Sequence, residues 1–281
     1  MLSQELTREQ LLVGLFLVAF SNGALLRAFD AADLAGPSRW AGAAMSTFGI
    51  SAIVWAAMWL GARFVLQGQH TAIRLADGAA AFAVIALTLI PSAVPAWVAM
   101  TGLALYLCST SKPDSPQRRG AWILLAVTIP MCWSRILFAS LADTILELEA
   151  ILVGTAMGSP RVGNMVQFAD GSGYMQIWPA CSSLANVSLA VLCWVTFSQA
   201  TGYRDSLRGA AWCVLACATV VLINVTRISL IGFFPQHYDL LHGVIGTSVA
   251  GWLILGASVG ICALGVRSAR EKTGLLEAAH V

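Results

Sequence analysis

Residues 209–226 read GAAWCVLACATVVLINVT, and this stretch contains no charged side chain. An α-helix needs about 20 predominantly apolar residues to cross a bilayer, and this stretch with its neighbours reaches that length. The rest of the chain is similar in composition, since 58% of its 281 residues are hydrophobic and only 11% are charged. Soluble domains carry about 25% charged residues, so this chain has too few to cover itself with a hydrated surface. The sequence therefore predicts an integral membrane protein.

Apolar stretches of this kind fill almost the whole chain, which predicts an all-α bundle of about eight transmembrane helices in a single membrane domain, 1–281. Only the connection 142–180 is long. The first apolar run has no convincing cleavage site after it and is interpreted as a retained helix. The net charge of +2 gives no reason to expect a nucleic acid partner, so the lipid bilayer is the expected surrounding. The expected spans lie near 11–29, 44–66, 72–90, 93–109, 120–141, 181–200, 208–230 and 242–266.

The distribution of basic residues indicates the orientation, because short cytoplasmic loops are enriched in Lys and Arg. Eleven of the 16 basic residues fall in one set of connections and five in the other. This bias places both termini in the cytoplasm and the 142–180 segment outside. The larger set comprises Arg8, Arg63, Arg74, Lys112, Arg118, Arg119, Arg204, Arg208, Arg267, Arg270 and Lys272, and the smaller set Arg27, Arg39, Arg135, Arg161 and Arg227.

The outer segment ends in a pattern typical of a β-hairpin. Residues 164–168 and 174–178 flank Ala-Asp-Gly-Ser-Gly at 169–173, and the glycines suit a turn. Upstream, Asp143 and Glu147 share one helical face, which indicates either an interfacial helix or an extension of the fifth span.

Three polar side chains fall at the outer ends of consecutive spans. Cys181 opens the sixth span, Arg227 lies near the end of the seventh, and His242 opens the eighth. Pro179 suits the first turn of a helix, which would place Cys181 at the positive end of the helix dipole, a setting that favours the thiolate. Arginine supplies a permanent positive charge, and histidine moves protons near neutral pH. Together these groups are typical of cysteine acyl chemistry.

Each residue also has a structural interpretation. A cysteine in a membrane helix is usually a small apolar filler, Arg227 could extend to the interface, and His242 could cap a helix. The remaining cysteines fit the filler pattern, and no pair has metal-ligand spacing. We therefore expect neither a metal nor a cofactor. Ser182, Ser183, Asn224 and Trp178 are the neighbours expected to support the site or bind substrate.

The same residues resemble the exosortase/archaeosortase family. The resemblance rests on Gly-Ser-Pro-Arg-Val-Gly-Asn at 158–164, Gly171, Pro-Ala-Cys-Ser-Ser-Leu at 179–184, Asn-Val-Thr-Arg-Ile at 224–228, and His-Gly at 242–243. In motif it covers about 155–250, and in topology the whole chain, because that family is also a bundle of about eight spans. Ser183 stands where the family commonly has glycine, and 185–186 lack its frequent basic residue, which indicates a divergent subfamily.

The resemblance implies a membrane cysteine protease or transpeptidase. Cys181 would be the nucleophile, Arg227 the essential arginine and His242 the third catalytic residue. The implied partners are exported proteins that end in a short motif, one transmembrane helix and a basic tail, cut at the outer face of the cytoplasmic membrane.

Three other classes share parts of the pattern. A transporter would place paired charges near the bilayer midplane, whereas Asp77 lies near an inner end and Arg135 toward an outer end. A non-catalytic assembly partner would need no reactive thiol. A membrane acyltransferase usually has a histidine deep in a funnel, and the histidines here are His70, His237, His242 and His280.

Overall fold

The structure is a computed structural model that describes residues 6–33, 50–68, 71–203 and 206–278. The expected span residues 44–49 lie outside these ranges, as do Arg39, His70, Arg204 and His280. Helices make up most of the described chain, which confirms the all-α fold. The chain divides into two compact units, an N-terminal unit of Met1–Cys132 with Ser198–Gly202 and a C-terminal unit of Trp133–Phe197 with Tyr203–Val281.

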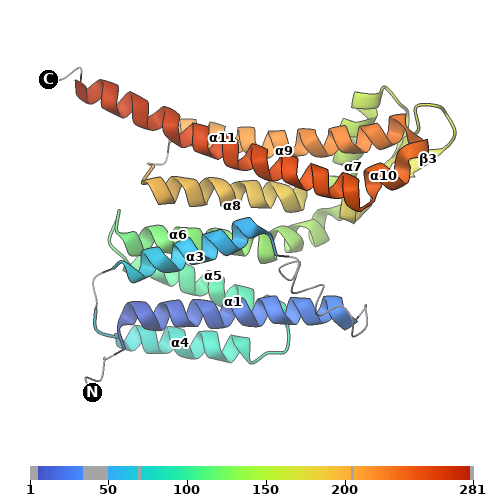
Figure 1. Ribbon diagram of the computed structural model, residues 1–281. Helices are drawn as coiled ribbons and strands as arrows, with labels where there is room; N and C mark the ends of the chain where they lie inside the picture. The colour runs from blue at the N-terminus through green and yellow to red at the C-terminus, as the bar shows by residue number, and fades with distance from the viewer. Residues whose placement is uncertain (1–5, 34–49, 69–70, 204–205, 279–281) are drawn as a thin grey trace. The chain divides into compact units, whose positions relative to one another are not determined.

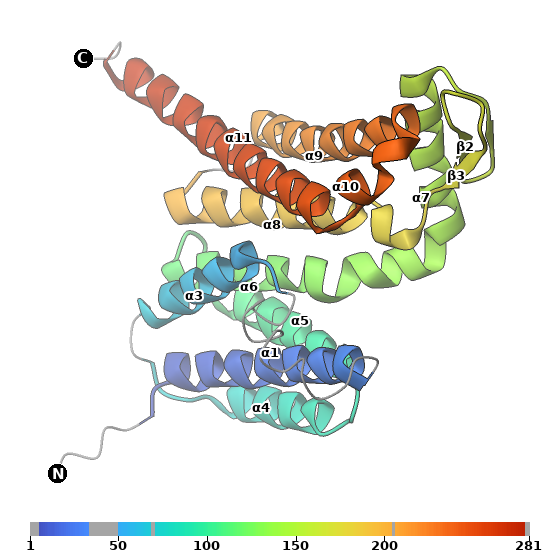
Figure 2. The same cartoon turned by 45° about the vertical axis from the view of Figure 1, so that its right-hand side comes forward.

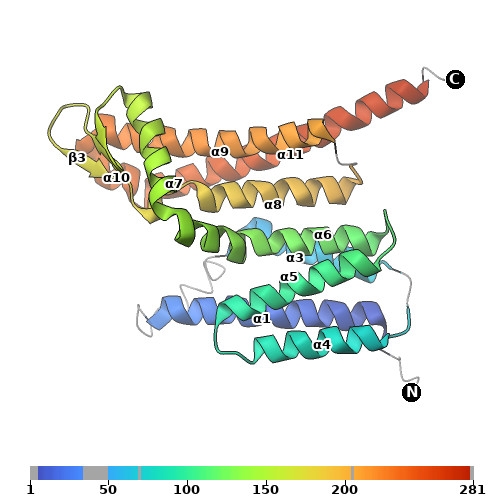
Figure 3. The same ribbon diagram turned by 180° about the vertical axis from the view of Figure 1, so that it is seen from behind.

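The N-terminal unit is a helix bundle with an aromatic centre. Phe20 meets Trp55 and Trp97 edge to face, with ring centroids 5.3 and 5.7 Å apart. Gly23 lets the Trp97 ring lie close to the backbone of the first helix, because a Cβ atom at Gly23 would lie 2.7 Å from that ring. Figure 3 shows α1, α4 and α5 side by side. The helices of the N-terminal unit in the described ranges are α1 (Arg8–Asp33), α3 (Ala52–Leu66), α4 (Leu75–Thr88), α5 (Ala93–Thr110) and α6 (Pro116–Thr128).

A buried ion pair joins three helices of this unit. Arg8 Nε donates to Asp77 Oδ1 at 2.8 Å, and the Tyr106 hydroxyl donates to the same oxygen at 2.7 Å. The backbone N–H of Arg74 donates to Asp77 Oδ2 at 2.7 Å, so both carboxylate oxygens are satisfied. A buried charge needs such partners, and this network therefore accounts for Asp77 structurally.

The chain continues from α6 through a π-helical turn, Ile129–Trp133, into α7 (Ser134–Met157). Pro130 has no backbone N–H to donate, and an insertion of this kind relieves the disrupted ladder. α7 has a second irregularity at Leu141, whose φ of −128° and ψ of 22° are not helical. The expected span 120–141 is therefore part of a longer, interrupted helix that extends to Met157.

The C-terminal unit contains the remaining helices and all the strands of the described chain. Figure 1 shows α9 and α11 side by side, with β3 and α10 at one end of this unit. The elements after α7 are β1 (Arg161–Val162), β2 (Met165–Gln167), β3 (Tyr174–Gln176), the 3₁₀ turn η3 (Pro179–Cys181), α8 (Leu184–Thr201), α9 (Leu207–Phe233), the 3₁₀ turn η4 (Pro235–His237), α10 (Tyr238–His242) and α11 (Val244–Ala278).

The predicted hairpin is confirmed, with one strand more than expected. β2 pairs with β3 in antiparallel register, Val166 opposite Met175, and β1 adds a two-residue strand on the other side of β2. Gly171 takes a φ of 74° in the turn, where a side chain would be strained. Hydrogen bonds from Ser172 hold the pKa of the exposed Asp170 below its ordinary value. Figure 2 shows β2 beside α7, and β1 also contacts this helix.

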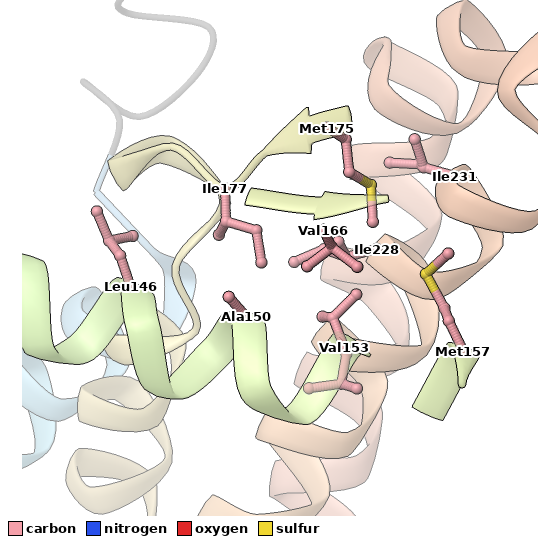
Figure 4. Packing of buried hydrophobic residues seen from close by; sticks show 10 residues of the cluster. Leu146, Ala150, Val153, Met157, Val166, Met175, Ile177, Ile228 and Ile231 are labelled. Atoms are coloured by element: carbon pink, nitrogen blue, oxygen red, sulfur yellow. The ribbon is translucent and has the colours of Figure 1, made fainter. Parts of the chain in front are cut away.

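One apolar cluster fixes the hairpin to α7 and α9 (Figure 4). From the hairpin side it includes Val166 and Ile177, which are 0% and 1% exposed. Cys181 and Leu241 pack against its edge. The cluster thus sets the path of the chain from β3 into η3. Its buried members are Leu146, Ala150, Val153, Met157, Val166, Met175, Ile177, Val225, Ile228 and Ile231.

Five helices in the described ranges are long and apolar enough to cross a membrane, which indicates a multi-pass membrane protein but does not reproduce the expected count of eight. α3 and α4 have 15 and 14 residues, and at 1.5 Å per residue they are shorter than the roughly 30 Å hydrocarbon core. The five are Arg8–Leu26, Ala93–Thr110, Pro179–Thr201, Leu207–Phe233 and Val244–Ser268.

The hairpin cluster predicts the effect of truncating Ile177. Ile177→Ala removes a side chain that is 1% exposed and should lower the free energy of unfolding by about 2–5 kcal/mol. Val162→Ala is the matched control, because Val162 is 63% exposed on β1. Thermal unfolding in detergent should show a clear loss for the first variant and almost none for the second. Equal midpoints would show that the cluster does not support the fold.

Candidate active site

The three polar residues singled out from the sequence all belong to the C-terminal unit. Cys181 ends η3, just before α8; Arg227 lies six residues before the end of α9; and His242 ends α10, just before α11. The end of α9 and the start of α11 are joined only by the short segment that contains η4 and α10. The connectivity therefore brings Arg227 and His242 to the same end of this unit.

Cys181 and His242 are in contact. Cys181 Sγ lies 3.9 Å from His242 Nε2, within reach of a weak hydrogen bond to sulfur. The imidazole stacks on Tyr238 one helical turn earlier, with ring centroids 4.8 Å apart and planes 11° from parallel. This stacking holds the ring with its edge toward the thiol. Tyr238 was not predicted from the sequence, although its spacing of four residues from His242 places the two side chains on one face of a helix.

Gly243 is required by the tight turn that carries His242. A Cβ atom at this position would lie 2.2 Å from the carbonyl oxygen of Asp239. The N–H of Gly243 donates to that same oxygen at 3.0 Å. The His-Gly pair thus has a steric basis in the ending of α10.

The start of α8 differs from the expectation that Cys181 lies in its first turn. α8 begins at Leu184, and Cys181 lies in the 3₁₀ turn before it, with its N–H donated to the carbonyl oxygen of Trp178 at 2.8 Å. The N–H of Ser182 is donated to Pro179 O at 3.2 Å. The N–H of Ser183 is donated to Glu149 Oε1 at 2.7 Å. The N–H groups of Cys181, Ser182 and Ser183 are therefore occupied and are not free to bind an oxyanion.

Both serine hydroxyls have the same acceptor. Ser183 Oγ and Ser182 Oγ donate to Glu149 Oε1 at 2.6 and 3.0 Å. Glu149 was missed in the sequence. Its signal is periodicity, because it falls on the apolar stripe of Leu146, Ala150, Val153 and Met157 rather than on the face of Asp143 and Glu147.

Asn224 and Arg227 occupy successive turns of α9. Asn224 Nδ2 donates to the carbonyl oxygen of Cys181 at 2.7 Å. Arg227 follows three residues later, about 4.5 Å further along the helix axis. Its Nε is buried and has no hydrogen-bond partner among the described residues. A buried donor without an acceptor is costly, so this guanidinium is suited to donate hydrogen bonds to an anionic or carbonyl oxygen of a ligand.

A cavity of about 450 Å³ lies along α9, α10 and α11. Its lining is apolar except for Thr226 and Arg227, so it suits an apolar ligand with a single polar group near the arginine. Leu240 and Leu241, which precede His242, belong to the lining. The other lining residues are Leu222, Ile223, Leu230, Ile245, Gly246, Val249, Ala250 and Leu253.

The indole of Trp178 has no hydrogen bond to the described residues of the site. It is 59% exposed, and only the backbone carbonyl of this residue meets Cys181.

No group of three His, Cys, Asp or Glu side chains in the described ranges is arranged to hold a metal ion. Comparisons with protein-family models, with curated proteins and with solved structures gave no match.

The exposure of the cysteines predicts selective labelling. Cys181 is partly exposed, whereas Cys108, Cys132, Cys193 and Cys262 are buried. In protein reconstituted into vesicles, a water-soluble maleimide should modify Cys181 first, as peptide mass spectrometry can show. Half-buried Cys213 and Cys217 lie within the apolar length of α9, where such a reagent does not enter. Labelling of Cys193 as fast as Cys181 would contradict this geometry.

Proposed function

We propose that the protein is a membrane-embedded cysteine peptidase or transpeptidase of exosortase-like type, which cleaves C-terminal sorting signals of exported proteins. The observation that carries the proposal is the contact between Cys181 Sγ and His242 Nε2 at 3.9 Å. A thiol beside an imidazole is the arrangement that activates a cysteine nucleophile. The resemblance of the surrounding motifs to the exosortase/archaeosortase family supplies the substrate class.

In the proposed reaction the Cys181 thiolate attacks the scissile carbonyl carbon and forms a carbon–sulfur bond. The carbonyl oxygen becomes an oxyanion, which Arg227 binds. His242, protonated by the thiol, returns that proton to the leaving amine as the carbon–nitrogen bond breaks. Water or an amine then displaces the thiol from the thioacyl enzyme and completes hydrolysis or transfer.

Arg227 has the oxyanion role because the donors that adjoin the thiol in the sequence, at residues 181–183, are occupied. The N–H groups of residues 181–183 and both serine hydroxyls already have acceptors. Arg227 Nε has none among the described residues. Preorganised donors of this kind contribute strongly to acyl transfer. The apolar cavity beside Arg227 would take the apolar part of the sorting signal.

Substitutions at the thiol test the proposal. Co-expressed with an exported protein that ends in a short motif, one transmembrane helix and a basic tail, Cys181→Ala and Cys181→Ser should abolish processing on immunoblots. His242→Ala should slow it about 10²–10⁴-fold, as for loss of a general acid–base. Cys193→Ala is the control, because that thiol is buried further along α8. Full cleavage by Cys181→Ala protein would refute the mechanism.

Two substitutions separate the effect of the planar shape of the Arg227 side chain from the effect of its charge. Arg227→Lys should impair processing nearly as much as Arg227→Ala, because an ammonium group lacks the planar fork that holds an oxygen from two sides. Processing rates of the two variants in the same strain provide the comparison. Wild-type rates for Arg227→Lys would assign this residue a general electrostatic role.

We further propose that the protein lies in the cytoplasmic (inner) membrane with both termini inside and the site outside. The support is the bias of Lys and Arg toward one set of connections. Reporter fusions after residue 115 and after residue 165 should then report opposite sides of the membrane. Reports from the same side would overturn this orientation.

A further inference from the structure

Glu149 is a buried carboxylate inside an apolar cluster. It is 6% exposed on α7, between Leu146 and Ala150, which belong to the cluster beneath the hairpin. An ionised carboxylate in such a place is strongly unfavourable unless hydrogen bonds compensate it. The partners of Oε1 therefore indicate why the chain carries a carboxyl group there, whereas Oε2 is buried without a partner among the described residues.

All three of its donors come from the two residues that follow Cys181. Glu149 Oε1 accepts from the Ser183 N–H at 2.7 Å, from Ser183 Oγ at 2.6 Å and from Ser182 Oγ at 3.0 Å. Hydrogen bonds to an ionised acceptor are short and strong. The carboxylate thus fixes the Ser182–Ser183 dipeptide to α7.

Capping of α8 alone does not account for this set of contacts. The carbonyl oxygen of Ser183 already accepts the N–H of Val187, and Ser182 Oγ accepts the N–H of Leu184. Asn224 holds the carbonyl oxygen of Cys181 from α9. The backbone at Cys181 is consequently anchored from two helices, on its own carbonyl and on the next two residues.

We propose that Glu149 is a positioning residue that sets Cys181 Sγ against His242 through Ser182 and Ser183. The inference rests on the proposed function and adds to it a residue that contacts neither substrate nor the reacting atoms. The contact of 3.9 Å is near the limit of a sulfur hydrogen bond, so a small displacement of η3 would break it. Loss of Glu149 should therefore remove the assistance that His242 gives to the thiol.

A double-mutant cycle measures this coupling without any substrate. The rate of alkylation of Cys181 by iodoacetamide is measured per folded protein in four forms: wild type, His242→Ala, Glu149→Ala and the double variant. In the wild-type background His242 should accelerate the reaction about tenfold, as expected for a base beside its nucleophile. The ratio of the alkylation rates with and without His242, here called the His242 factor, should fall to nearly one in the Glu149→Ala background.

Three variants complete the test. If Glu149→Ala does not fold, Ser183→Ala takes its place in the test. It removes the donor at 2.6 Å from Glu149 and should also lower the His242 factor. Glu147→Ala and Glu147→Gln are matched controls, because Glu147 lies two residues away on the same helix, is exposed and pairs with Arg161 at 3.2 Å. Both Glu147 variants should leave the factor unchanged.

The outcomes separate this inference from the proposed function. A His242 factor of about ten that persists in Glu149→Ala or Ser183→Ala protein would show that Glu149 only stabilises the fold. That result would leave the cysteine mechanism standing. A factor of one in the wild-type background would overturn both, because no thiol–imidazole assistance would exist to be positioned.

Discussion

The apolar contact between the hairpin and the helices α7 and α9 is the constraint on which the C-terminal unit depends. Val166 and Ile177 are fully buried against residues of both helices, and β3 leads directly into the 3₁₀ turn that ends at Cys181. Hydrophobic packing therefore sets the path of the chain that leads to the thiol. Leu241, beside His242, packs against the same cluster, so one core contacts both Cys181 and the neighbour of His242.

Polar groups then refine what packing has placed. Asn224 binds the carbonyl oxygen of Cys181, Glu149 binds the two serines after it, and Tyr238 stacks on the imidazole of His242. Each contact comes from a different stretch of the chain, from α7, α9 and α10. In the described part of the chain, Arg227 Nε is buried without a partner, and so is Glu149 Oε2. We give Arg227 the oxyanion role because it is a permanently charged donor whose Nε is free to bind an oxygen of a ligand.

The sequence predicted most of the features that arise from local patterns. The hairpin followed from glycines between two short apolar segments, and the placement of Cys181 and His242 at the ends of neighbouring helices followed from the order of apolar runs. Helix count was predicted less well, because hydropathy alone does not show that α3 and α4 are short or that Pro130 lies in a π turn within a longer helix. Glu149 was missed because it lies two residues from the exposed Glu147 and looks in the sequence like another exposed charge. Only the structure shows that the face of α7 that carries Glu149 is buried. The occupied N–H groups around Cys181 were also beyond prediction, since they depend on a turn that only tertiary packing selects.

The central claim is that Cys181 forms a covalent bond to its substrate. It is tested most directly by mass spectrometry of the wild-type protein, incubated with a sorting-signal substrate and quenched with acid during turnover. The account predicts a thioester between Cys181 and the newly formed carboxyl end of the substrate, released by hydroxylamine. Cleaved substrate with no adduct on Cys181, or with the adduct on another residue, would contradict it.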